Sequence, residues 1–202
     1  MKELDFLKAQ VNPHFLLNAI NSIYSLIDED QELASETLLK FAGLLRYQLY
    51  DCASEYTPLK REAEFLNDYI GLEMLCKKKN LTVIFDGNIN DNYALIAPSI
   101  LIPFVENAFK HRSHFDRGNY INITAGIDGN MLKFSVTNTY NEHSIVNAVK
   151  EHCGIGLKNV YRRLELLYDN RYRLQVKKAH GIYSVNLELE LIGNKMDVRI
   201  AI

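Results

Sequence analysis

One histidine stands in a setting that suits attack on phosphorus. His14 lies in the run Gln10-Val11-Asn12-Pro13-His14-Phe15-Leu16-Leu17-Asn18, inside a segment whose apolar spacing predicts a helix. A histidine side chain is substantially neutral at pH 7, so a free ring nitrogen can act as a nucleophile. Pro13 predicts a kink or local break beside it, and the amides of Gln10 and Asn18 lie one turn away. A histidine that only packs or caps at a helix kink fits the same residues.

A second polar cluster falls on the predicted helical run 103–111. Asn107, Lys110 and His111 share one face there, and Glu106 lies a turn from Lys110. An amide oxygen can ligate Mg²⁺, which prefers hard oxygen donors and shares them with phosphates. The lysine could meet phosphate charge, and the glutamate could orient a group or accept a proton. A solvated helix face carries the same residue types.

A third cluster is the run Gly154-Ile155-Gly156-Leu157-Lys158-Asn159, which opens a predicted helix after a loop. Glycine lets the backbone approach a phosphate, and a helix N-terminus offers N–H groups and a positive dipole end. The run is neither a P-loop nor a Rossmann fingerprint. A zinc site built from His111, His114, His152 and Cys153 is not expected, because the spacing is irregular and no acidic partner is placed for it.

The first 79 residues predict three amphipathic helices. Apolar residues recur from Glu3 to about Ile27, and the other two helices follow the polar stretch 28–32 and Thr57-Pro58, a predicted N-cap with proline at the first helical position. Their apolar faces are Ala34, Leu38, Phe41, Leu45 and Leu49, then Leu59, Ala63, Leu66, Ile70 and Met74. Such helices bury their stripes against one another, against a second domain, or across a dimer.

The remaining residues, 80–202, predict an α+β sandwich with helices on one face of a sheet. Strands are expected at 81–85, 120–127, 131–139, 172–178 and 182–191, helices at 98–112 and 155–168, and a loop at 140–153. Asp128-Gly129-Asn130 and His180-Gly181 are hairpin signals. We therefore place a domain boundary between residues 79 and 80.

Composition excludes several classes of protein. The chain of 202 residues has 23 basic and 25 acidic side chains, without the clustered positive charge of a nucleic-acid or membrane-surface binder. Its 3 cysteines form no CxxC pair, which favours a reducing cytoplasm. No apolar run is long enough for a membrane helix or for the core of a signal peptide.

Taken together, the three clusters resemble the LytS-type sensor histidine kinases, whose catalytic domain belongs to the GHKL ATPase superfamily. Residues 7–18 are similar to that family's phospho-acceptor box, and 44–47 with 59–72 to the rest of its dimerisation segment. Residues 98–111 resemble its N-box, and 154–160, followed by Arg163-Leu164, its second glycine box. Three motifs in this order are far more specific than any one of them.

The resemblance implies a dimerisation and phospho-acceptor segment at 1–79 and a GHKL-type ATP-binding domain with a mixed sheet at 80–202. It implies in-line transfer of phosphate from ATP to His14, with Mg²⁺ held by Asn107. The full set of implied site residues is His14 and Glu106 for catalysis, and Asn107, Lys110, His111, Asn138, Gly154, Gly156 and Leu157 for the nucleotide. It further implies a homodimer, a response-regulator receiver aspartate as phosphate acceptor, and a cytoplasmic location, or the cytoplasmic part of an inner-membrane sensor.

Two departures keep alternatives open. Asn138 stands where the superfamily carries the aspartate of a D-x-G turn, which accepts a hydrogen bond from the adenine amine, and an uncharged acceptor is weaker. His152-Cys153 replace a further glycine. A degenerate kinase that dimerises and binds nucleotide without phosphotransfer is therefore one alternative. A GHKL ATPase or serine kinase acting on another protein is a second, although it leaves the His14 box unexplained.

Overall fold

The computed structural model describes residues 13–76, 80–89, 93–111, 118–140 and 155–193. Its helices are α2 (Pro13–Glu29), α3 (Gln31–Tyr50), the short 3-10 helix η1 (Asp51–Ala53), α4 (Leu59–Cys76), α5 (Ile102–His111) and α6 (Ile155–Tyr168). Its strands are β1 (Thr57–Pro58), β2 (Leu81–Asn88), β3 (Leu95–Ile96), β4 (Asn119–Asp128), β5 (Met131–Thr139), β6 (Tyr172–Ala179) and β7 (Ile182–Glu190). The predicted α+β class is confirmed.

Five strands form a mixed sheet in the order β2-β4-β5-β7-β6. β2 and β4 run parallel, which requires a crossover connection, and α5 lies in it. The other neighbours are antiparallel, and β4 and β5 form the hairpin predicted around Gly129. In the β6–β7 hairpin both His180 and Gly181 have positive φ, the backbone that a tight two-residue turn demands.

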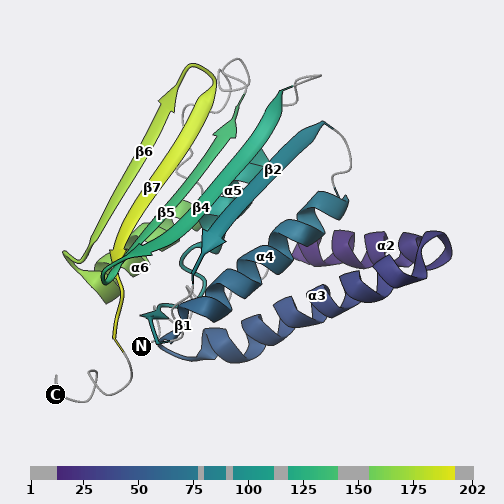
Figure 1. The fold of residues 1–202 in the computed structure, drawn as a ribbon, viewed down its shortest axis with the longest axis horizontal. Helices are drawn as coiled ribbons and strands as arrows, with labels where there is room; N and C mark the ends of the chain where they lie inside the picture. The colour runs from purple at the N-terminus through teal and green to yellow at the C-terminus, as the bar shows by residue number, and fades with distance from the viewer. Residues whose placement is uncertain (1–12, 77–79, 90–92, 112–117, 141–154, 194–202) are drawn as a thin grey trace.

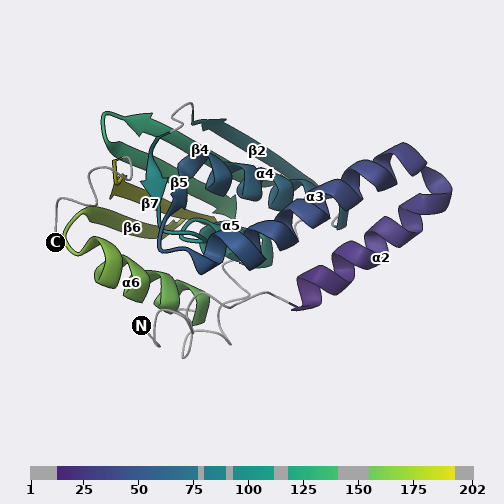
Figure 2. The same ribbon diagram turned by 90° about the horizontal axis from the view of Figure 1, so that it is seen from below.

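The sheet is covered on one face only. Figures 1 and 2 show α5 and α6 on one side of it, with α4 alongside near β2, whereas the opposite side carries no helix of the described chain. β4 shows the resulting alternation, since Ile121 and Ile123 are buried and Asn122 and Thr124 are exposed. The sheet is therefore half of a two-layer sandwich.

The first three helices join this sandwich through α4. The hairpin of α2 and α3 projects away from the sheet, and α4 lies between α3 and β2 (Figure 1). Aromatic pairs hold both helices to α4: Phe15 lies 4.7 Å from Tyr69, and Tyr47 lies 4.2 Å from Phe65, between ring centroids. A single cluster of buried apolar residues runs from α2 through α4 into the sheet.

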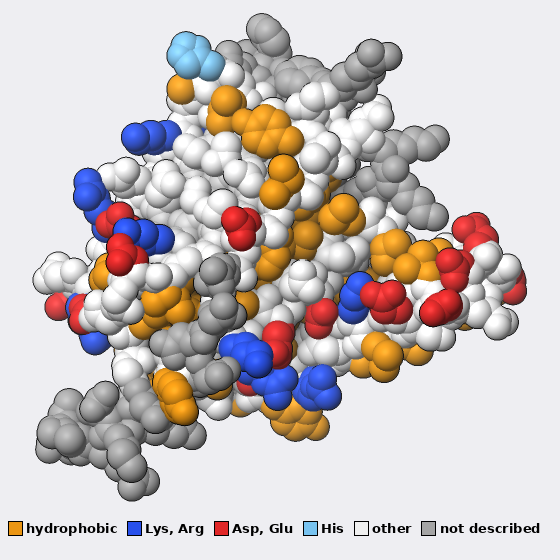
Figure 3. All heavy atoms as spheres, viewed as in Figure 1, with side chains coloured by type: hydrophobic (Ala, Val, Ile, Leu, Met, Phe, Trp, Pro, Cys, Tyr) orange, Lys and Arg blue, Asp and Glu red, His pale blue; other side chains and the backbone are white. Residues whose placement is uncertain are grey.

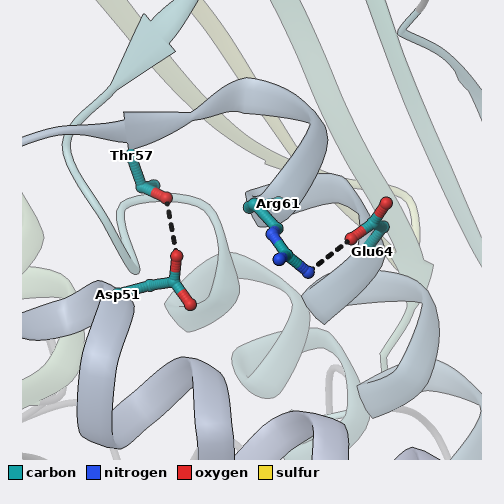
Figure 4. A network of polar contacts seen from close by, with 4 residues as sticks. All are labelled: Asp51, Thr57, Arg61 and Glu64. Carbon is teal, nitrogen blue, oxygen red and sulfur yellow. Dashed lines mark hydrogen bonds and ion pairs between the residues drawn. The ribbon is translucent and has the colours of Figure 1, made fainter. Parts of the chain in front are cut away.

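The connection from α3 to α4 corrects one predicted helix start. Thr57 is not a helix cap. It lies in β1, which pairs with β3, and its hydroxyl donates to Asp51 Oδ1 at 3.2 Å (Figure 4). α4 starts at Leu59, and Figure 4 also shows the ion pair of Arg61 and Glu64, 3.3 Å apart, in its first turns. The sequence pattern assigned residues 57 and 58 to the start of the helix, but their backbone pairs with β3 as a strand instead.

Removal of the Tyr168 hydroxyl group would test how α6 packs on this core. Tyr168 is fully buried and accepts a 2.7 Å hydrogen bond from the backbone N–H of Ala97. Tyr168→Phe leaves that N–H buried without its acceptor, so we expect the free energy of unfolding in urea to fall by about 1–3 kcal/mol. Tyr50→Phe, at a residue 71% exposed, is the matched control and should change it by less than about 0.5 kcal/mol. Equal effects of the two substitutions would contradict this assignment.

Candidate functional site

His14 lies in the first turn of the described part of α2, with its side chain exposed. Nδ2 of Asn18 lies 3.2 Å from its Nδ1 atom. An amide can serve either tautomer of a neutral imidazole: its NH₂ group donates to a bare Nδ1, and its oxygen, after a half-turn, accepts from a protonated one. Asn18 is therefore placed to orient the ring. Gln10, the other amide considered, lies outside the described residues.

The helix that carries His14 has three distinct stripes. One is buried against the rest of the chain: Phe15, Ala19, Ile23 and Leu26. A second is apolar but exposed, and we call it the apolar stripe: Leu17, Ile20, Tyr24 and Ile27. A third is polar and exposed, and we call it the polar ridge: His14, Asn18, Asn21 and Ser25. At 3.6 residues per turn these spacings put the polar ridge between the other two stripes.

Helix α5 carries the second predicted cluster. Its apolar residues Phe104, Val105 and Ala108 are buried, and the helix packs against β4 and β5. Its polar residues lie away from that core: Glu106 and Asn107 are half-buried, and Lys110 and His111 are exposed. Their common helix is as predicted, and their binding roles stay predictions. The helix begins four residues later than the predicted start at Pro98.

Glu106 lies where α5 meets α4. Burial, and secondarily the charge of Glu73, raise the pKa of the Glu106 carboxyl to about 7. Glu73 is itself buried on α4 and accepts a 2.9 Å hydrogen bond from the hydroxyl of Tyr69. The Tyr69 ring lies against Phe15 and edge-on to Phe109 of α5, at 6.2 Å. The residue that follows His14 and the helix that carries Asn107 thus pack on the same tyrosine.

Asn138 lies near the end of β5 and is fully buried. Its Nδ2 donates to the carbonyl of Thr139 at 3.0 Å, and its Oδ1 has no hydrogen-bond partner among the described residues. Buried acceptors are rarely left unsatisfied, so such an atom marks a place for a donor that the described residues do not supply. The structure thus leaves the acceptor free and fixes the donor end of the amide.

Five of the six residues of the glycine run, 155–159, are described and open α6. Gly156 and Leu157 lie in the first turn of α6, and Leu157 is buried. Gly154 and residues 141–153 of the predicted loop 140–153 lie outside the described residues. The helix boundaries 155–168 are as predicted.

A buried polar cluster was missed in the sequence. Glu62 of α4 is fully buried, and its two oxygens accept from the backbone N–H groups of Ser99 (2.9 Å) and Leu101 (3.0 Å) and from the hydroxyl of Tyr47. Burial raises the pKa of Glu62, and these three donors and the Arg163 guanidinium oppose that rise. A visible signal existed: Glu62 falls on the predicted apolar face of its helix, between Leu59 and Leu66.

The part of the chain that the structure describes contains neither a metal-binding cluster nor a membrane-spanning helix. No three histidine, cysteine or acidic side chains gather there closely enough to hold a metal ion. No helix in those ranges has the length and apolar character needed to cross a bilayer.

The raised pKa of Glu106 predicts a pH-dependent stability. The unfolded chain has the ordinary carboxyl pKa of 4.5, so the folded state binds the proton more tightly and stability falls as pH rises from about 4.5 through about 7. In Glu106→Gln this component is absent. The difference in unfolding free energy between wild type and variant, measured in urea, should therefore change with pH inside that window and level off outside it. A difference that stays flat across that window for Glu106→Gln would refute the assignment.

Comparison with known proteins identifies the family. Residues 2–81 match the histidine kinase family. The chain is 34% identical over 176 residues to the sensor histidine kinase YpdA of Escherichia coli K12, covering 82% of this chain and 30% of that protein. It is 33% identical over 190 residues to the sensor protein LytS of Staphylococcus saprophyticus, covering 88% of this chain and 32% of that protein. The chain thus spans about a third of the length of these relatives.

The fold agrees with these matches. The histidine kinase domain of the blue-light activated histidine kinase EL346 from Erythrobacter litoralis superposes with a TM-score of 0.51 at 14% identity, over 94% of this chain and 91% of that one. At that identity the likeness concerns the fold alone, whereas the sequence matches reach across both the helical and the sheet-bearing parts. The chain belongs to the sensor histidine kinases of the LytS type.

Proposed function

We propose that this chain is the dimerisation and catalytic core of a protein-histidine kinase that transfers the γ-phosphoryl group of ATP to His14. The observation that carries the proposal is the setting of His14: exposed on the polar ridge, oriented by Asn18, and followed by a phenylalanine that packs with α5 on Tyr69. Residues 1–79 supply the phospho-acceptor and the dimer, and residues 80–202 bind the nucleotide.

The free acceptor on Asn138 supports adenine as the base. Thr139 holds the Nδ2 end of the amide, so Oδ1 is the end that meets a ligand, and an amino group on a purine is a suitable donor. Asn107 and Lys110 on α5, with the N-terminus of α6 at Gly156 and Leu157, would hold the phosphates, His111 lying beside Lys110. A Mg²⁺ ion on the amide oxygen of Asn107 offsets phosphate charge when bound.

Phosphoryl transfer requires mainly that the protein positions His14 and the γ-phosphate of ATP correctly. With the amide oxygen of Asn18 on a protonated Nδ1, the other ring nitrogen, Nε2, keeps its lone pair for the γ-phosphorus. An N–P bond forms as the bond from phosphorus to the bridging oxygen breaks, and ADP leaves. The phosphorylated ring then loses its Nδ1 proton to water or to a carboxylate, for which Glu106 is our candidate.

A second copy of the chain would cover the apolar stripe. Its four residues are between 47% and 76% exposed, and α3 adds Leu38 and Leu49 at 53% and 69%. Figure 3 shows apolar side chains at the surface of the projecting hairpin of α2 and α3. Because the polar ridge is separate from this stripe, a dimer through the stripe leaves His14 open to the catalytic domain and to a receiver-domain aspartate. Such a core acts in the cytoplasm.

One observation favours a second candidate, a dimeric nucleotide-binding module without phosphotransfer. Asn138 offers an uncharged acceptor, which binds the adenine amine less strongly than a carboxylate would. Binding without labelling of His14 distinguishes this candidate from the kinase.

The kinase is tested by separating binding from transfer. His14→Gln should bind ATP with the wild-type dissociation constant and take up no acid-labile phosphate, since it lacks only the nucleophile. In Asn107→Ala, the dissociation constant for ATP in the presence of Mg²⁺, measured by calorimetry, should rise by about tenfold or more. Acid-labile phosphate retained on His14→Gln would refute the mechanism, and a folded wild type that binds no ATP would refute the proposed function.

The dimer interface is tested with a charge on the apolar stripe. Tyr24→Glu places two carboxylates, one from each copy, in a surface that association would bury, so we expect the dimer dissociation constant to rise by about 100-fold or more. Sedimentation equilibrium measures it. Asn21→Glu, on the polar ridge of the same helix, is the matched control and should leave the dimer intact. A dimer unaffected by Tyr24→Glu would place the interface elsewhere.

A further inference from the structure

The turn that leads into α5 is held by side chains from two other helices. Residues 98–101 precede Ile102, where α5 begins. Glu62 of α4 accepts from the N–H groups of Ser99 and Leu101, so its carboxylate lies at the N-terminus of α5. A negative charge there satisfies N–H groups that the helix itself leaves unpaired, and it interacts favourably with the helix dipole.

The carbonyl groups of the same turn are bonded from the opposite element. Arg163 of α6 donates to the carbonyl oxygens of Pro98, at 2.5 Å, and Ser99, at 3.2 Å, and its side chain is buried. The turn therefore lies between a carboxylate and a guanidinium, with the hydroxyl of Tyr47 donating to the carboxylate. The two opposite charges compensate each other. The carboxylate binds backbone N–H groups, and the guanidinium binds backbone carbonyl groups.

The backbone of the turn would not hold this shape unaided. Ser99 has a φ of 55°, in the left-handed region that residues other than glycine rarely occupy. Both its N–H group and its carbonyl are bonded within the cluster. A strained residue persists where the surrounding structure determines its conformation, and here Glu62 and Arg163 are the groups that do so.

We propose that Glu62 is a positioning residue for nucleotide binding: from α4 it fixes the first turn of α5 and so the placement of Asn107 and Lys110. This inference rests on the proposed function, because it concerns the same nucleotide site. Helix α4 also packs against the helix that carries His14, through Tyr69 and Phe15. One carboxylate thus ties the nucleotide helix to the helix on which the phospho-acceptor packs.

The test is Glu62→Gln in the full chain. The amide keeps the size of the side chain but lacks the charge and turns an NH₂ group toward donors. We expect the dissociation constant for magnesium–ATP to rise about tenfold or more, because displacement of binding groups by about 1 Å is costly. In nucleotide-free protein, amide hydrogen exchange should accelerate at Ser99, Leu101 and along α5, while the β4–β5 hairpin keeps its protection.

Three further variants separate positioning from general loss of stability. Leu44→Ala removes a buried apolar side chain of α3 that cannot hydrogen-bond the turn, and it should lower the melting temperature while leaving ATP binding at low temperature unchanged. Tyr47→Phe removes one donor to Glu62 and should give a smaller change of the same kind, so it also serves if Glu62→Gln fails to fold. Glu62→Gln combined with Arg163→Gln should weaken binding by less than the product of the two single effects, because neither charge is then left uncompensated.

The outcomes distinguish the inference from the proposed function. Wild type that binds no ATP overturns the proposed function, and this inference with it. Wild type that binds ATP, together with a Glu62→Gln variant that binds equally well or exchanges no faster at Ser99 and Leu101, overturns the inference alone. A Leu44→Ala variant that loses ATP binding to the same degree also overturns it, because loss of stability would then account for the effect.

Discussion

The buried carboxylate of Glu62 is bound or faced by groups from three other elements of this fold. An ion removed from water loses several kcal/mol of solvation, which only closely placed donors and an opposite charge can offset. None of the donors to Glu62 in the described structure comes from its own helix. Glu62 is served by Tyr47 from α3, by two N–H groups of the turn before α5, and electrostatically by Arg163 from α6. The relative positions of four helices are therefore fixed by the needs of one side chain.

This constraint explains why the helical part and the sheet-bearing part share one core. If α4 were only a dimerisation helix, its buried face would meet other helices and end there. Instead its apolar residues continue into the cluster under the sheet, and Tyr69 contacts aromatic rings from both α2 and α5. A movement of α2 relative to α5 has to disturb this packing, which makes α4 the element through which the two helices are mechanically linked.

The sequence predicts well those elements that are determined by neighbouring residues. The β4–β5 hairpin around Gly129 and the helix 155–168 follow from local periodicity and turn residues, and both are confirmed. The starts of α4 and α5 were predicted too early, because strand pairing at Thr57 and the bonds of the 98–101 turn come from distant parts of the chain. Periodicity also cannot tell which of several apolar stripes is buried. On α3, Phe41 is buried and Leu38 is exposed, although the pattern gives them one face.

In the candidate site, too, some features follow from the local sequence and others only from the three-dimensional structure. The residue types at His14, Asn107 and Lys110 could be singled out from spacing and resemblance, whereas the part of Asn18 depends on an atom-to-atom distance and that of Glu62 on burial. Helix α2 combines three surfaces with different roles on one short helix. A regular helix from Pro13 to Glu29 keeps its stripes in register over its whole length, so one stripe packs on the chain, one stays apolar at the surface, and one presents the histidine. A proline inside that range would remove a backbone hydrogen bond and kink the helix, and the stripes would then lose their register.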